Sequence, residues 1–267
     1  MKNDASDRRN FIKLSTLSLA GFSLPAASAL AKEPVGRKAA DGNTDQKLNI
    51  LCVGGHPGDP EFGCGGTLAK YSAAGHSVTI LYLTRGEGWA GDKSLSYEQA
   101  AALRTKEAET SCKILQAKPL FAGQIDGNSE FNKKRSDEMT KLILSVNPHI
   151  VFTQWPIDTH MDHQVTACLT LTAWVNSQQR FDLYYYEVDT GSDTYGFAPT
   201  DYVDITDVRE KKKAALLAHN TQRPQEIYDK DFLAMENFRG LEAGVKAAEA
   251  FVHFKTKAQR ATITGLG

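Results

Sequence analysis

Two short segments of the chain combine histidine with aspartate, the side chains best suited to hold a divalent metal ion. The first contains His56 and Asp59, and the second contains His160, Asp162 and His163. Imidazole nitrogens and carboxylate oxygens are ligands of Zn²⁺, and a catalytic zinc site uses three protein ligands and leaves a fourth position open. The sequence therefore predicts one metal site shared by the two segments, with His56 and Asp59 as two ligands and His163 or His160 as the third.

Helix capping is the alternative explanation for the same residues. His160 and His163 could cap the helix expected behind them, and Asp59 could cap the first helix. Asp158, in the second segment, is expected to be structural and to support one of the histidines. Two segments of this composition in equivalent places favour a metal site over two unrelated caps.

The expected secondary structure places both segments at the same edge of a sheet. The apolar runs 48–53 and 150–153 are expected to be strands, and each is followed by one of the polar segments and then by a helix. In open α/β sheets, ligands bind outside the carboxyl ends of the strands. This edge is where we expect the site.

The rest of the chain continues the alternation of strands and helices. Further strands are expected at 77–84, 119–122, 183–188 and 202–205, and helices at 64–74, 96–115, 136–146, 162–178, 207–219 and 232–254. This order predicts an α/β fold with a mainly parallel sheet and helices on both faces, to which the later strands add an antiparallel edge or a small subdomain. The glycines at 63–66 lack the spacing of a phosphate-binding loop, which disfavours a nucleotide-binding protein.

Composition and charge exclude some classes of partner. The 267-residue chain is 41% hydrophobic and 24% charged, as is ordinary for a globular protein. Its formal net charge of −1 gives no electrostatic reason to expect binding to nucleic acid or to an anionic membrane surface.

The beginning of the chain has the pattern of an export signal. Arg8 and Arg9 precede an apolar stretch at 14–24 and then small residues up to Ala29 and Ala31, which resembles a twin-arginine signal. The apolar stretch is too short for a convincing membrane span, so no stable membrane insertion is expected after signal removal. We expect a signal at 1–31, a flexible lead-in at 32–46, one domain at 47–267, and a periplasmic location.

Both polar segments resemble the signature motifs of one protein family. They read Gly54-Gly-His-Pro-Gly-Asp-Pro-Glu-Phe-Gly-Cys-Gly-Gly66 and Trp155-Pro-Ile-Asp-Thr-His-Met-Asp-His163. These are similar to the paired motifs of the PIG-L/LmbE family of zinc-dependent N-deacetylases, and stretches at 103–108, 202–206 and 212–219 are similar to further family blocks. The resemblance covers most of the chain after the signal. It implies a Rossmann-like three-layer fold, a Zn²⁺ cofactor or another divalent metal, and an N-acetylated sugar or glycoconjugate as the small-molecule partner.

The resemblance also implies roles for individual residues. It assigns His56, Asp59 and His163 as metal ligands. It assigns His160 to polarising the amide carbonyl and stabilising the oxyanion. Asp162 is expected to orient a histidine from outside the metal's own ligands, as carboxylates commonly do around zinc.

One position departs from the family motif. The motif reads His-Pro-Asp-Asp, and its first Asp is the general base; this chain has Gly58 there. General acid–base assistance contributes about 10²–10⁴-fold, so a loss of about that size is expected. Three explanations compete: a variant or engineered inactive form, a natural metal-dependent carbohydrate-binding protein without turnover, or a substitute carboxylate from Glu61 or Asp162.

Three further residues correspond to positions that line the family's sugar pocket. They are Arg104, Glu87 and Asp126. Arg104 could instead pair with Glu107 or Glu109 on the protein surface. The expected activity is therefore removal of an N-acetyl group from an amino sugar or sugar conjugate, impaired by Gly58, with carbohydrate binding without turnover as the alternative.

Overall fold

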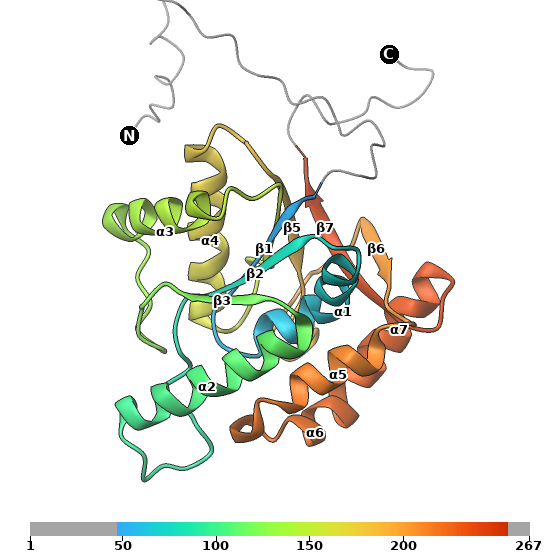
Figure 1. Ribbon diagram of the computed structural model, residues 1–267, viewed down its shortest axis with the longest axis horizontal. Coiled ribbons are helices and arrows are strands. Elements are labelled where there is room, and N and C mark those ends of the chain that lie inside the picture. Colours follow the sequence, from blue (N-terminus) through green and yellow to red (C-terminus); the bar gives the residue numbers. More distant parts are fainter. Residues whose placement is uncertain (1–46, 256–267) are drawn as a thin grey trace, which may run out of the picture. The chain divides into compact units, whose positions relative to one another are not determined.

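The computed structural model describes residues 47–255, in which one seven-stranded sheet carries helices on both faces (Figure 1). The expected signal at 1–31 and lead-in at 32–46 lie outside the described residues. The strands are β1 (Asn49–Gly54), β2 (Ser77–Tyr82), β3 (Lys118–Phe121), β4 (Ile150–Gln154), β5 (Asp182–Tyr186), β6 (Asp201–Asp204) and β7 (Ala248–Phe254). The helices are α1 (Asp59–Ala73), α2 (Tyr97–Leu115), α3 (Lys133–Ser145), α4 (Met161–Asn176), α5 (Arg209–Leu217), α6 (Pro224–Ile227) and α7 (Leu233–Ala243). A 3₁₀ turn (Asn220–Gln222) and a π-helical turn (Tyr228–Phe232) flank α6.

The order of the strands creates a crevice beside the first strand. The order is β3-β2-β1-β4-β5-β7-β6, and β1 pairs in parallel with β2 on one side and β4 on the other. The chain therefore reverses its direction of winding between β1 and β4. Ligands of open α/β sheets bind at such a point, outside the carboxyl ends of the strands. The loops that follow β1 and β4 are the two polar segments.

Side chains of the central strands alternate between two cores. Ile50 and Cys52 pack in a core with side chains of α1 and α2, whereas Leu51 and Val53 pack on the other face with side chains of α3 and α4. All four are fully buried, as expected for a strand covered on both faces. The expected three-layer α/β fold with a mainly parallel sheet is confirmed.

The first helix begins earlier than the sequence pattern indicates. We expected it to start at residue 64, but α1 starts at Asp59. Pro60 stands in the first turn, where a missing N–H costs nothing. Two glycines of this helix are required by packing: a Cβ at Gly63 would lie 2.2 Å from the Tyr186 ring, and one at Gly66 would lie 2.5 Å from Ile205.

The expected helix at 232–254 is wrong in its second half. Helix α7 ends at Ala243, and Gly244 follows with a left-handed φ of 73°. The chain then forms β7, which runs antiparallel to both β5 and β6 and buries its first four residues. Two neighbouring strands supply backbone partners along β7, and this pairing outweighs the helical propensity of an alanine-rich stretch. The expected antiparallel edge is confirmed.

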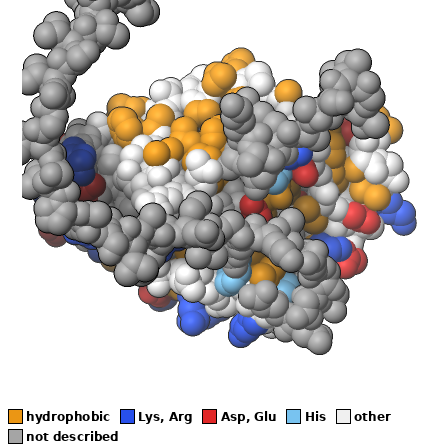
Figure 2. Space-filling model, turned by 90° about the horizontal axis from the view of Figure 1, so that it is seen from above, with side chains coloured by type: hydrophobic (Ala, Val, Ile, Leu, Met, Phe, Trp, Pro, Cys, Tyr) orange, Lys and Arg blue, Asp and Glu red, His pale blue; other side chains and the backbone are white. Residues whose placement is uncertain are grey.

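The described residues contain no helix that meets the length and apolarity of a membrane span. On the face seen in Figure 2, hydrophobic side chains gather over the upper part of the visible surface, and Lys, Arg, Asp and Glu lie mainly toward its sides and lower edge. Neither sign of charge dominates this face.

Candidate metal centre

One oxygen of Asp59 lies between two histidines that come from different elements. Asp59 Oδ2 is 3.2 Å from His56 Nδ1 and 3.2 Å from His163 Nε2. The same oxygen accepts hydrogen bonds from the backbone N–H of His56, at 2.8 Å, and from Gln154 Nε2, at 3.1 Å. His56 belongs to the loop after β1, Asp59 begins α1, and His163 lies in the first turn of α4. The two polar segments therefore meet across the crevice.

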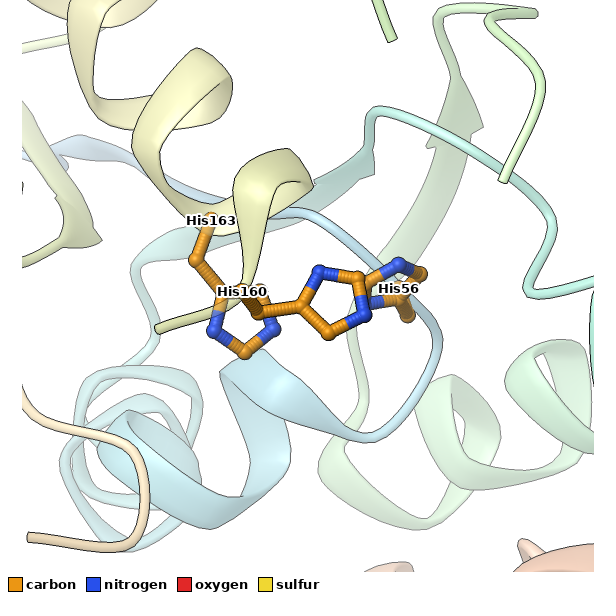
Figure 3. Close-up of side chains that lie close together, drawn as sticks. All are labelled: His56, His160 and His163. Atoms are coloured by element: carbon orange, nitrogen blue, oxygen red, sulfur yellow. The ribbon is translucent and has the colours of Figure 1, made fainter. Parts of the chain in front are cut away.

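These separations suit a shared metal ion. Two ligands about 2.0–2.2 Å from a tetrahedral ion are roughly 3.3–3.6 Å apart, and one carboxylate with two imidazoles is a ligand set of catalytic zinc sites. His160 also belongs to the cluster, because ligand atoms of His56, His160 and His163 lie within 4.8 Å of one another. Figure 3 shows these three side chains gathered between the loop after β1 and the start of α4. The residues present fit a divalent cation.

The outer nitrogen of each buried histidine faces a carboxylate. His56 Nε2 lies 3.0 Å from Asp162 Oδ2 and 3.1 Å from Asp126 Oδ1. His163 Nδ1 lies 3.0 Å from Asp158 Oδ1. Carboxylates in this place fix the ring tautomer and turn the other nitrogen toward the metal. The expectation that Asp158 supports a histidine is confirmed.

The charges of the cluster shift its titration strongly. Burial alone would lower the pKa of His56, but Asp59, Asp126 and Asp162 outweigh burial and raise that pKa well above its ordinary value. Burial would also lower the pKa of His163. Asp59 and Asp158 outweigh burial and raise that pKa to about 9. The two histidines in turn hold the pKa of Asp59 well below its usual range against the effect of burial. Without metal, the cluster favours protonated imidazoles.

His160 differs from the other two histidines in exposure and charge. It is the N-cap of α4, it reaches the surface, and its Nδ1 accepts the backbone N–H of Asp162 at 3.3 Å. Burial and the neighbouring His56 and His163 lower the pKa of His160. A neutral ring that accepts at Nδ1 carries its hydrogen on Nε2. His160 is therefore a neutral hydrogen-bond donor beside the cluster.

Gly58 lies between the two ligands of the first loop and leaves no side chain there. Its φ is +112°, and a Cβ built on it would be 3.5 Å from the Phe62 ring. Of the two substitutes named above, Glu61 uses both carboxylate oxygens in other contacts, whereas Asp162 uses Oδ2 and has an Oδ1 without a hydrogen-bond partner among the described residues. Glu61 is fully buried, with Oε2 accepting the Gly58 N–H at 3.1 Å and Oε1 accepting the Tyr82 hydroxyl at 2.7 Å. Asp162 is fully buried as well and accepts the Gly127 N–H at 2.8 Å.

Of the three expected sugar contacts, the structure brings two together. Asp126 Oδ2 accepts the Gly88 N–H at 2.9 Å, and Glu87 Oε1 lies 3.4 Å from the N–H of Asp126. Arg104 is elsewhere: it is 3% exposed, lies behind the first loop, and donates from Nη2 to the Pro57 carbonyl at 2.8 Å. It is therefore not a surface residue.

The sequence did not point to Gln154, which contacts the cluster directly. Its Nε2 donates to Asp59, and its Oε1 accepts the N–H of Gly55 at 2.7 Å. The signal was a polar residue at the end of a strand that begins with three apolar residues. That signal becomes informative once β4 is known to lie beside β1.

Comparisons with known proteins agree on one group of relatives. A model of the PIG-L family, described as GlcNAc-PI de-N-acetylase, matches residues 51–174. The diacetylchitobiose deacetylase of Thermococcus kodakarensis is 29% identical over 192 residues, which cover 67% of this chain and 72% of that protein. The 1D-myo-inositol 2-acetamido-2-deoxy-alpha-D-glucopyranoside deacetylase of Rhodococcus erythropolis is 30% identical over 158 residues, 49% of this chain and 54% of that protein, so this chain spans about half of its length.

A solved structure supports the same grouping. The N,N'-diacetylchitobiose deacetylase of Pyrococcus horikoshii, solved with an inhibitor, superimposes with a TM-score of 0.69 at 28% sequence identity. The superposition covers 77% of this chain and 83% of that one.

Proposed function

Because the chain belongs to the PIG-L/LmbE family of N-acetyl sugar deacetylases, we propose that it is a metal-dependent hydrolase that removes an acetyl group from an amino sugar or sugar conjugate. The observation that carries this proposal is the placement of Asp59 Oδ2 at 3.2 Å from both His56 Nδ1 and His163 Nε2. These three residues are the proposed metal ligands. Zn²⁺ is the proposed ion, although the ligand set also admits another divalent metal.

When bound, the metal polarises the amide carbonyl and lowers the pKa of water. The side chains around it orient the ligands and stabilise the charge that develops on the carbonyl oxygen. Asp158, Asp126 and Asp162 hold the outer nitrogens of the ligand histidines, so that both rings keep their orientation. His160 donates from Nε2 to the carbonyl oxygen, which becomes more negative as water adds to the amide. Hydrolysis then yields acetate and the free amine.

We place the sugar beside Glu87 and Asp126. Glu87 is partly exposed, and the Asp126 side chain keeps 14% of its surface exposed although it contacts His56. Carboxylates accept hydrogen bonds from sugar hydroxyls, which orients the ring over the metal. A glycoconjugate fits the same arrangement as a free sugar, because the contacts proposed here involve only the acetylated ring.

Gly58 supports a second candidate function. A glycine cannot take a proton from water or return one to the leaving amine, so turnover is expected to fall by about 10²–10⁴-fold relative to a chain with a base. A chain that keeps the metal and the sugar contacts without useful turnover would be a metal-dependent carbohydrate-binding protein. Only turnover separates the two functions.

The test measures acetate release and sugar binding on the same protein. Metal-loaded protein is incubated with N-acetylglucosamine, diacetylchitobiose and N-acetylglucosaminyl conjugates, and binding to the same sugars is followed by calorimetry. Release of acetate above the rate of a His160→Ala variant supports the deacetylase. Binding without release in either protein supports the carbohydrate-binding alternative. Neither binding nor release of any N-acetyl sugar would contradict both.

A further inference from the structure

One peptide group of the metal-binding loop is held at both of its polar atoms. The carbonyl of Pro57 and the N–H of Gly58 belong to the same peptide unit, which lies between the ligands His56 and Asp59. The N–H donates to Glu61 Oε2 at 3.1 Å, and the carbonyl accepts from Arg104 Nη2 at 2.8 Å. Both side chains reach this peptide from the protein interior.

The first contact continues to the turn that follows α5. Glu61 Oε1 lies 3.2 Å from His219 Nε2 and accepts the Tyr82 hydroxyl at 2.7 Å. Glu61 and His219 are both fully buried, so no water competes for these groups. Tyr82 is the last residue of β2, and His219 directly precedes the 3₁₀ turn.

The second contact leads to the same turn by another route. Glu107, one turn after Arg104 on α2, lies 3.7 Å from Arg104 Nη1. Both oxygens of Glu107 are occupied by Thr221, whose N–H donates at 2.8 Å and whose hydroxyl donates at 2.7 Å. The segment 219–221 thus supports Glu61 and Arg104 at once, although it is far from the metal ligands in sequence.

Arg104 contributes little to stability in this position. It is 3% exposed, and within residues 47–255 its Nε and Nη1 have no hydrogen-bond partner. Burying a cation whose donors are not all satisfied is costly. A Cβ at Gly86 would lie 2.7 Å from Arg104 Nε, so the backbone packs closely over the guanidinium. A buried guanidinium that is costly to keep and that donates to the Pro57 carbonyl points to a role in fixing the position of that peptide.

Gly58 makes this support necessary. Glycine loses more conformational freedom on ordering than any other residue, and Gly58 adopts a φ of +112° that its own side chain cannot stabilise. We propose that Arg104 and Glu61 are positioning residues that fix the Pro57–Gly58 peptide, and that the 219–221 turn, through Glu107 and His219, keeps the metal loop in its binding conformation. The proposal rests on the metal site of the proposed function.

The test compares two chemically identical changes on the same helix. Glu107→Gln weakens the support of Arg104, whereas Glu109→Gln alters an exposed carboxylate of α2. Three quantities are measured: Zn²⁺ affinity of metal-stripped protein by chelator competition, hydrogen exchange of the Gly58 amide, and free energy of unfolding. Because changes just outside a metal's ligands cost about 10–100-fold in affinity, we expect about a tenfold loss for Glu107→Gln and none for Glu109→Gln.

Further variants keep the proposal falsifiable. Arg104→Met should lower Zn²⁺ affinity and speed Gly58 exchange, and Arg104→Lys, which can still donate to the Pro57 carbonyl, should restore part of both. If Arg104→Met does not fold, Thr221→Val replaces it as the test variant, because it removes the hydroxyl that donates to Glu107. Unchanged affinity and unchanged Gly58 exchange in variants that are merely less stable would overturn the proposal. A wild-type protein that binds no Zn²⁺ would refute the proposed function, and Gly58 exchange would then decide this inference alone.

Discussion

The backbone of Gly58 is in a conformation that suits glycine and strains other residues. Its φ of +112° lies where L side chains are rare, and non-glycine residues held in such regions cost about 1–3 kcal/mol. The space beside it is open, since the nearest atom to a Cβ would be 3.5 Å away. A side chain at this position would therefore find room, but it would strain the backbone.

The backbone conformation of Gly58 also affects any substitution that restores a general base at this position. We expect Gly58→Asp to raise acetate release by about 10²–10⁴-fold if a base is all that is missing, while costing stability through backbone strain. Gly58→Ala and Gly58→Asn carry the same strain without a carboxylate and serve as controls. Equal rates in the Asp and Asn variants would show that the carboxylate is not what the site lacks.

The histidine cluster predicts an unusual pH dependence in the metal-free protein. The pKa of His163 is about 9 in the folded chain against an ordinary 6.5, so its contribution to stability is complete below pH 6.5 and is lost as pH rises through 9. We expect the unfolding free energy of metal-free protein to fall over this interval. His163→Gln should flatten the decline, and an unchanged slope in that variant would contradict the assignment.

The sequence was enough to predict the clustering of residues that follow neighbouring strands of the sheet. His56, Asp59 and His163 each follow a strand of a parallel sheet, and strand ends meet at one edge, so type and position are enough to predict that they gather. The pairing of Arg104 with Glu107 was among the alternatives, but the contacts of Glu107 with Thr221 and of His219 with Glu61 could not be predicted. These contacts depend on how α2 packs on the turn after α5, and nothing in the local spacing of these residues records that packing.

Helix α1 packs closely against the sheet and against the segment that leads into α5. Its residues Gly63, Gly65 and Gly66 allow neighbouring side chains to approach the helix backbone. Close approach also sets the position of Asp59 at the start of the helix. The glycines at 63–66 therefore serve the packing of α1, the helix that begins with the proposed ligand Asp59. Their spacing differs from that of a phosphate-binding loop.

Two alanine substitutions in α1 should differ in how much they destabilise the fold. Gly63→Ala would bring a Cβ within 2.2 Å of the Tyr186 ring and 2.6 Å of the Glu187 carbonyl, so we expect a loss of about 1–3 kcal/mol from overpacking. Gly65→Ala would place a Cβ 3.1 Å from Cγ of Lys212, a buried side chain paired with Glu236 and Glu249, and it gains up to about 1 kcal/mol of helix propensity, so we expect a smaller loss than for Gly63→Ala. Denaturant unfolding measures both. Equal destabilisation would contradict this account of the packing.

The strands were easier to predict than the last helix. Runs such as 77–84 are apolar on both faces, and a buried parallel strand leaves that pattern in the sequence. Residues 248–254 alternate less clearly and follow a helical stretch, so periodicity alone favoured one long helix. The partners of β7 decide its structure, and both of them lie elsewhere in the chain.

At the scale of the whole molecule, the metal cluster lies between β1 and β4, where the winding of the parallel part of the sheet reverses. The ligands come from the ends of β1 and β4, which are neighbours in the sheet although about 100 residues separate His56 from His160 and His163. The two core layers on either side of these strands hold the two loops in register.

We propose that residues 1–31 direct export, a segment outside the described residues. Replacing Arg8 and Arg9 together by lysine should keep the chain in the cytoplasm, because a twin-arginine signal is read through that pair. Cell fractionation measures the location, and amino-terminal sequencing of exported protein should find cleavage after Ala29 or Ala31. A Lys13→Arg variant is the control. Undiminished periplasmic protein in the double variant would contradict the proposal.

Metal dependence of acetate release is the most direct test of the central claim. Protein stripped with a chelator is titrated with Zn²⁺ while acetate release from an N-acetyl sugar is followed, in wild type and in Asp59→Asn. We predict that release is lost on stripping and returns as one equivalent of Zn²⁺ is added, and that the variant needs far more metal. Acetate release that persists unchanged in stripped protein, or an Asp59→Asn variant that titrates like wild type, would contradict the account.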